Sequence, residues 1–166
     1  MRGSLRRRAF RSFDRRMAPF RVMLDSNAFD VLALDDVVRA NIERHVSDGI
    51  VELVITHIQA DELNKTPDDD LRRRLLRLTV VATYTAGFVI GLSRLDMAAL
   101  MTEEEVGIYN AVVAGNPTKN AEDAVILLTA RHDGLPVVTN ERRLPNQCRL
   151  HGVRAWNTDE FLAQLC

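Results

Sequence analysis

The chain has 166 residues, 46% of them hydrophobic, and a formal net charge of −1 at pH 7. This length and composition can bury one core of ordinary size, so a single domain that forms a homodimer is expected. No apolar run approaches the roughly 20 residues that cross a bilayer, and the two cysteines lack metal or redox spacing. These features exclude a disulfide framework and favour a cytoplasmic protein.

The start of the chain is strongly basic. Between Arg2 and Arg21 there are eight arginines and one acid, Asp14, which leaves a net charge of about −8 for the remainder. Three interpretations stay open: a cloning remnant or mis-assigned start before Met17, a flexible arm that contacts nucleic acid, or an Arg-rich transit peptide. We therefore expect a basic arm over residues 1–20 and one domain over residues 21–166.

Strands and helices alternate along the first half of the domain. A short apolar strand at 21–24 is followed by a helix at 31–49, a β-branched strand at 50–56 and a helix at 57–65. Thr56 and Gln59 have the spacing of a capping box at the start of this last helix. The alternation predicts a three-layer α/β/α sandwich around a central parallel sheet of four to five strands.

The middle of the chain, at about 66–117, is expected to be a helical insertion. Helices are predicted at 68–84 and after Thr102, and residues 87–93 fit a short strand. The final third predicts further elements in the following order: a helix at 121–133, a strand at 136–140, a short helix at 142–150, a strand at 153–156, and a last helix capped by Asn157 or Thr158.

Four acids lie at or near the carboxyl ends of predicted strands. Asp25 ends the first strand, and Glu62 lies on the helix after the second. Asp123 lies in the first turn of the helix predicted at 121–133, and Glu141 directly follows the strand predicted at 136–140. Ligands bind at this edge of an open parallel sheet. Each acid also has an ordinary structural explanation: Asp25 as a helix cap, Glu62 as a solvated acid, Asp123 as the capping partner of Asn120, and Glu141 as a turn acid.

Electrostatics favours a cation among these acids. Two carboxylates about 6 Å apart repel by roughly 3 kcal/mol at an effective dielectric constant of 20. A site with only carboxylate ligands suits the hard ions Mg²⁺ or Mn²⁺, which prefer oxygen. These ions promote phosphodiester hydrolysis by activating water and by neutralising charge on the phosphate. The pattern therefore predicts a metal-dependent hydrolase.

Several segments resemble the PIN domain, the fold of many metal-dependent ribonucleases, including the VapC-type toxins of toxin-antitoxin pairs. The segments are "VMLDSNAF", "THIQADEL", "NAEDAVILLTARHDGLPVVTNERRL" and "GVRAWNTDEFL", and the resemblance runs from about Arg21 to Leu165. The match Asp123-Ala124-x-Ile126-x-x-x-Ala130 is the most specific. The chain departs from the family at Glu141, where the common pattern has Asp, in its long span between Glu62 and Asp123, and in its basic arm.

This resemblance implies an endoribonuclease that cleaves single-stranded RNA with Mg²⁺ or Mn²⁺. The metal would be held by Asp25, Glu62 and Asp123, with Glu141 assisting from the edge. Asn27, Thr139 and Asn140 are candidates to position water or phosphate. If the protein is a toxin, an antitoxin protein would block the site by inserting a basic group, often Arg, among the carboxylates.

A ribonuclease with an acidic centre needs cations around it, because phosphate contacts supply much of the affinity for nucleic acid. Candidate RNA-binding residues are Lys65, Lys119, Arg142 and Arg143, with the arginine run at 72–74, although such a run is usually a solvated helix face. The four histidines lack ligand spacing. Trp156 is more often a packing residue than a stacking platform for a base.

Two alternatives remain open. A non-catalytic PIN-like module that binds RNA or protein would be favoured by loss of an acid, but Asp25, Glu62 and Asp123 are all present. A haloacid-dehalogenase-like phosphatase would need an Asp-x-Asp motif, and Asn27 occupies the second position. The "GNPTKN" segment lacks the spacing of a phosphate-binding P-loop, so an NTPase is excluded.

Overall fold

A five-stranded, all-parallel sheet with the order β3-β2-β1-β4-β5 forms the centre of the molecule. This computed structural model describes residues 18–165, apart from the side chains of residues 118 and 119, so most of the predicted arm at 1–20 lies outside the described residues. The strands are β1 (Phe20–Leu24), β2 (Val51–Thr56), β3 (Val81–Thr83), β4 (Val137–Val138) and β5 (Ala155–Trp156).

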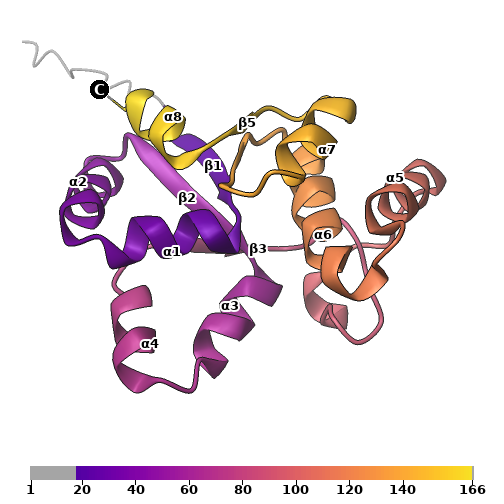
Figure 1. Ribbon diagram of the computed structural model, residues 1–166, viewed down its shortest axis with the longest axis horizontal. Coiled ribbons are helices and arrows are strands. Elements are labelled where there is room, and N and C mark those ends of the chain that lie inside the picture. Colours follow the sequence, from indigo (N-terminus) through magenta and orange to yellow (C-terminus); the bar gives the residue numbers. More distant parts are fainter. Residues whose placement is uncertain (1–17, 166) are drawn as a thin grey trace, which may run out of the picture.

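Helices cover both faces of this sheet, which confirms the predicted α/β/α architecture. In Figure 1, α1 and α2 lie on one side of the strands, and α6 and α7 lie on the other. The helices are α1 (Ser26–Leu34), α2 (Asp36–Ser47), α3 (His57–Lys65), α4 (Asp69–Leu75), α5 (Glu103–Val113), α6 (Pro117–Asp133), α7 (Leu144–Leu150) and α8 (Thr158–Ala163), with a short 3₁₀ helix, η1, at Leu95–Met97.

The central strand β1 supplies both cores because its side chains alternate between the two faces. Val22 and Leu24 belong to the cluster beneath α1, α2 and α8. Met23 belongs to the cluster beneath α5, α6 and α7. All three are fully buried, and burying such a side chain is worth roughly 1.5–3 kcal/mol. The end of β1 is therefore fixed from both sides.

The helix predicted at 31–49 is two helices, and the first begins earlier. Helix α1 starts immediately after Asp25, and the chain turns at Asp35. The Asp35 side chain accepts hydrogen bonds from the backbone N–H groups of Val37 and Val38, at 2.9 and 3.0 Å, and so caps α2. A strong cap inside an apolar pattern explains the break.

The segment at 66–117 contains a strand as well as helices. The helix predicted at 68–84 ends at Leu75, and residues 81–83 then pair in parallel with β2 as the edge strand β3. β-Branched residues at Val80, Val81 and Thr83 favour this extended conformation. The strand predicted at 87–93 is absent, because residues in this part of the structure form turns and loop.

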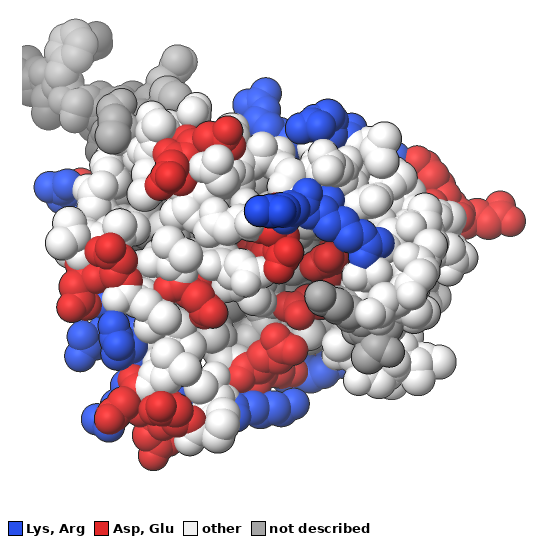
Figure 2. Space-filling model, in the orientation of Figure 1, with Lys and Arg blue, Asp and Glu red and all other residues white. Residues whose placement is uncertain are grey.

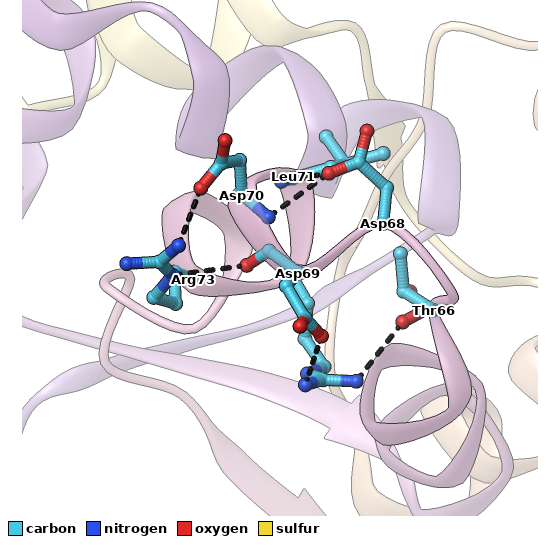
Figure 3. Close-up of polar contacts among 7 residues, drawn as sticks. Thr66, Asp68, Asp69, Asp70, Leu71 and Arg73 are labelled. Atoms are coloured by element: carbon cyan, nitrogen blue, oxygen red, sulfur yellow. Dashed lines mark hydrogen bonds and ion pairs between the residues drawn. The ribbon is translucent and has the colours of Figure 1, made fainter.

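Local polar contacts close the start of α4 (Figure 3). The Asp68 carboxylate accepts from the backbone N–H groups of Asp70 and Leu71. Arg73 pairs with Asp70 at 2.5 Å, one turn along the helix. Arg74 reaches beyond the helix and donates to the carbonyl of Leu34, the last residue of α1, at 2.9 Å, so α4 packs beside α1.

Three predicted capping patterns are confirmed. Thr56 and Thr102 each form a complete capping box, at the starts of α3 and α5. Asn157, rather than Thr158, caps α8.

In the described part of the chain, no helix is both long enough and apolar enough to cross a membrane.

Candidate functional site

The first acid lies where the strand order of the sheet reverses. β1 is hydrogen-bonded to β2 on one side and to β4 on the other, so the chain proceeds outward in one direction and later returns to the opposite side. Such a switch point opens a crevice at the carboxyl ends of the two central strands. Asp25 follows β1 there, and its backbone N–H donates to Val138 of β4 at 2.9 Å.

The Asp25 side chain is held by the strand on the far side of this crevice. Asp25 occupies the N-cap position of α1, but its carboxylate makes no capping hydrogen bond, so the cap interpretation fails. Its Oδ2 instead accepts from the Thr139 hydroxyl at 2.7 Å. Both side chains are buried, with exposures of 4% and 1%. The same Thr139 hydroxyl accepts from the Glu141 backbone N–H at 3.0 Å, which fixes the turn after β4.

Asn27 connects Asp25 to the fourth predicted acid. Its side-chain amide donates to Glu141 Oε1 at 2.9 Å and, over a longer 3.4 Å, to Asp25 Oδ2. Glu141 therefore lies on the rim of the crevice, one amide group away from the buried acid. The sequence distance of 114 residues between Asn27 and Glu141 is closed by the pairing of β1 with β4.

A second chain of contacts reaches the other side of the crevice. The Gln59 side chain of α3 donates to the Leu24 carbonyl at 3.0 Å and to the Ser26 hydroxyl at 3.3 Å. Ser26 in turn donates to the carboxylate of Glu122, on α6, at 3.0 Å. Gln59 thus fixes α3 to the end of β1, and Ser26 brings a carboxylate from α6 against the same residues.

Glu122 marks the place where the negative charges converge. Its pKa is raised to about 7, first by burial and then by the Glu62 carboxylate, with smaller contributions from Asp25 and Asp123, while the Ser26 hydrogen bond opposes the shift. A carboxyl group influenced by three other acids lies among them. Glu62, Asp123 and Asp25 therefore all lie within electrostatic reach of Glu122.

The alternative role of Asp123 as a capping partner of Asn120 is wrong. Helix α6 begins at Pro117, four residues before the predicted start at 121. Proline suits the first position of a helix because its φ angle is already helical and its missing N–H is not needed there. Asp123 consequently lies inside the helix, beyond its first turn.

Burial also raises the pKa of Asp25. Hydrogen bonds from Thr139 and Asn27 oppose this shift, and the carboxylate of Glu141 adds to it. The pKa of Asp30, one turn further along α1, is raised by burial and by Asp25. Negative charge is thus in excess around the crevice, and Figure 2 shows acidic side chains gathered near the middle of this face.

The acids are close enough to influence each other, but they do not yet form a coordination shell. Among residues 18–165, no group of three or more His, Cys, Asp or Glu side chains is arranged to hold a metal ion. Glu62 and Glu141 are exposed at the surface of the crevice. Both have side chains long enough to swing, whereas Asp25 is fixed by Thr139.

The other predicted contact residues divide into two groups. Asn140 points to α8, where its amide donates to the Thr158 hydroxyl at 2.6 Å and its oxygen accepts from the Thr158 N–H at 3.1 Å. Arg143 donates to the carbonyl of Val112 in α5. These two side chains join elements together, whereas Lys65 and Arg142 are exposed. Only the backbone of Lys119 is described.

Two site residues were missed by sequence reasoning. Gln59 is evident from sequence only as half of a capping box, and its donor end faces β1 instead of solvent. Glu122 precedes the best-matched acid directly. Recognising Pro117 as the start of α6 would have moved Glu122 from the helix terminus into its interior, where a half-buried acid needs an explanation.

No family model and no curated protein matches the chain. Among solved structures, it is similar to the crystal structure of VapBC2 from Rickettsia felis bound to a DNA fragment from their promoter, with a TM-score of 0.45 and 15% identity over 82% of this chain and 98% of that chain. It is also similar to FitAcB from Neisseria gonorrhoeae, with a TM-score of 0.43 and 14% identity over 82% of this chain and 97% of that chain. A likeness at these values carries no argument about function.

Replacing Glu122 by glutamine should stabilise the metal-free protein at neutral pH. The folded-state pKa of about 7 lies above the ordinary 4.5, so the stability linked to this group is complete below pH 4.5 and falls as the pH rises through 7. A shift of this size sets a ceiling of about 3 kcal/mol, and partial exposure reduces the expected gain to roughly 1–2 kcal/mol.

Urea unfolding of wild type and E122Q between pH 4.5 and 8, in chelator, measures this gain. The difference between the two proteins should grow with pH. Glu103, an exposed acid on α5, supplies the control, and E103Q should follow the wild-type curve. If the unfolding free energies of wild type and E122Q change in parallel with pH, the pKa of Glu122 is not raised in the folded protein.

Proposed function

We propose that this protein is a metal-dependent endoribonuclease with a PIN-like domain, acting on single-stranded RNA. One observation carries the proposal: Asp25 is buried at the switch point of a parallel sheet, where carboxylates from α3, α6 and the turn after β4 converge. A purely structural acid would not need three further acids around it.

The donor set fits a hard divalent cation by its chemistry. Asp25, Glu62 and Asp123 would hold Mg²⁺ or Mn²⁺, with Glu141 assisting from the rim. Their oxygens are the ligands that these ions prefer. Burial and, after it, the neighbouring carboxylates raise the pKa of Glu122, and a cation would relieve the repulsion among these carboxylates. Because the present side-chain positions form no coordination shell, Glu62 and Glu141 would have to turn inward.

The chain's own residues have separable tasks in this proposal. When bound, the ion supplies Lewis acidity and lowers the pKa of coordinated water. Thr139 orients the Asp25 carboxylate by donating to Oδ2, which leaves Oδ1 to bind the metal ion. The Asn27 amide donates to Glu141 and would donate to a phosphate oxygen instead when substrate binds. Thr139 is therefore a positioning residue for Asp25, whereas Asn140 holds α8 against the turn after β4.

Substrate binding requires cations outside the acidic centre. Lys65 is exposed at the end of α3, which carries Glu62, and Arg142 is exposed in the turn after β4, next to Glu141. Lys and Arg side chains lie beside the acidic ones on the face shown in Figure 2. This arrangement favours a polyanion that approaches the acids only with metal present.

The alternatives make different predictions. A PIN-like module that only binds RNA or protein would lose Asp25 without a change in its binding affinity. A phosphatase of the haloacid-dehalogenase type needs a second aspartate at position 27, and Asn27 is occupied with Glu141. A toxin would have an antitoxin partner that places a basic group among the carboxylates, and a neighbouring reading frame for a small protein would support that role.

Asp25→Asn should lower metal-dependent RNA cleavage by roughly 100-fold or more, because it removes a ligand charge at the centre of the site. The amide oxygen still accepts from Thr139, so the circular dichroism spectrum should not change. Turnover of a mixed single-stranded RNA pool with Mn²⁺ measures the effect.

Asp48→Asn, at the exposed end of α2, is the matched control and should keep full activity. Wild-type activity in both variants would exclude Asp25 as a catalytic residue. Equal activity with chelator and with Mn²⁺ would exclude the metal.

Asp123→Asn should reverse its effect on stability when metal is added. In chelator the variant should melt at the same or a higher temperature than wild type, because one repulsive charge is gone. In Mn²⁺ at about 100 times its dissociation constant, wild type should gain about 2.7 kcal/mol and the variant less. If Mn²⁺ raises both melting temperatures equally, or neither, Asp123 is not a ligand.

The homodimer expected from the sequence is also part of this proposal. The segment between β3 and α5 leaves Ile90, Leu95 and Leu100 exposed by 90%, 82% and 88%. Exposed apolar side chains that gather in one segment indicate a protein contact surface, and β3 beside it is an edge strand.

The double variant L95D/L100D should sediment as a monomer at concentrations where wild type is a dimer, because two charges would be buried in the contact. V37D is the matched control, since Val37 on α2 is equally exposed, at 81%. A wild-type protein that remains monomeric in analytical ultracentrifugation rules the homodimer out.

A further inference from the structure

A cavity lies beside the start of β1 and the turns that lead into β4 and β5. It has a volume of about 380 Å³, and it is lined by Phe20 at the start of β1, by the residues before β4 and β5, and by Arg131, Arg154 and Trp156. β1 has five residues and rises about 3.3 Å per residue, so Phe20, its first residue, lies roughly 15 Å from Asp25. None of the described residues that line it is acidic.

Aromatic rings form one wall of this cavity. The rings of Phe20 and Trp156 are 5.7 Å apart and tilted by 56°. Phe20 is 38% exposed, which is unusual for a large apolar residue at the start of a central strand. The Arg154 guanidinium lies 5.7 Å from the centre of the Trp156 ring. Nucleic-acid bases stack both on aromatic rings and on guanidinium planes.

Arginines extend this surface beyond the rings. A neighbouring cavity of about 410 Å³ shares Gly152, Val153 and Arg154 with the first and adds Arg149. Arg131 pairs with Glu104 at 2.5 Å, and both side chains are partly exposed, so solvent weakens this pair and a phosphate can compete with it. The Arg149 guanidinium donates to the neutral side chain of Asn146 at 3.3 Å. The two cavities therefore carry positive charge on an otherwise acidic body.

We infer that these two cavities form a binding site for single-stranded RNA, separate from the reactive acids. Phosphates would bind Arg149 and Arg154, and a base would stack on the Arg154 guanidinium or beside Trp156 and Phe20. Cations alone would also suit an acidic peptide. The exposed Phe20 ring and the partly exposed Trp156 ring beside them favour nucleic acid, because every base offers a flat face. The link to cleavage rests on the proposed function, but RNA binding does not.

Trp156 gives a local signal for this site, since it is the only tryptophan in the chain. A single-stranded oligoadenylate, added to the full-length protein in chelator, should quench Trp156 fluorescence saturably. In a parallel anisotropy titration with labelled RNA, R149Q/R154Q should weaken binding about tenfold. Loss of two phosphate contacts should also reduce the slope of log affinity against log salt by about 1.4.

Matched variants separate this site from general charge effects. R44Q removes an exposed arginine on α2 that donates to the Asn41 side chain and should bind RNA as wild type does. R154K keeps the charge but loses the planar group. It should therefore have the salt slope of the wild type but a weaker quenching of Trp156 fluorescence. Unchanged RNA affinity in R149Q/R154Q, with an intact circular dichroism spectrum, overturns the inference.

Competing ligands give further decisive outcomes. Quenching by polyglutamate that equals quenching by RNA would indicate an acidic protein partner and overturn the RNA assignment. Equal quenching by inorganic phosphate at the same phosphate concentration would indicate a simple anion site and also overturn it. Quenching that requires the oligonucleotide supports it.

Cleavage assays distinguish failure of this inference from failure of the proposed function. If both are right, long RNA should have a lower KM than short RNA, and R149Q/R154Q should remove this difference without changing kcat on short RNA. If RNA binds at Trp156 but no RNA is cleaved with Mn²⁺, only the proposed function fails. If RNA is cleaved but the double variant keeps the length effect, only this inference fails.

Discussion

The hydrogen bond between Thr139 and Asp25 is the contact on which the site depends. It joins the ends of the two strands at which the sheet changes direction, and both partners are buried. A buried carboxylate is tolerated only when its oxygens have partners. Thr139 meets that need on one side, and it also accepts the Glu141 N–H. One hydroxyl thereby sets the position of an acid and the turn that carries another.

Much of the architecture could be predicted from sequence because its causes are local. β-Branched runs gave β2, and the capping boxes at Thr56 and Thr102 gave the starts of two helices. The break at Asp35 and the edge strand β3 were not predicted. Asp35 lies inside an apolar pattern that continues through it, and β3 follows a helix with only a short separation. At β3, pairing with β2 decided between two locally acceptable conformations, whereas at Asp35 the helix cap outweighed the apolar pattern.

The candidate site was predictable at its strand ends and less so along its helices. A residue that follows a strand is placed by the sheet, which is why Asp25 and Glu141 lie near each other. A residue on a helix depends on where the helix begins. The start of α6 at Pro117 moved Asp123 out of the first turn and brought Glu122 against Ser26. No sequence spacing encodes that contact, which spans 96 residues.

The separation of Asp25 and Thr139 along the chain has a consequence for biosynthesis. They are 114 residues apart, so the first acid leaves the ribosome long before its partner does. Contacts of such long range form late in folding, because the loop between them must be closed first. A nascent chain that ends before β4 lacks the partner that fixes Asp25. The site around Asp25 is therefore incomplete until Thr139 has left the ribosome.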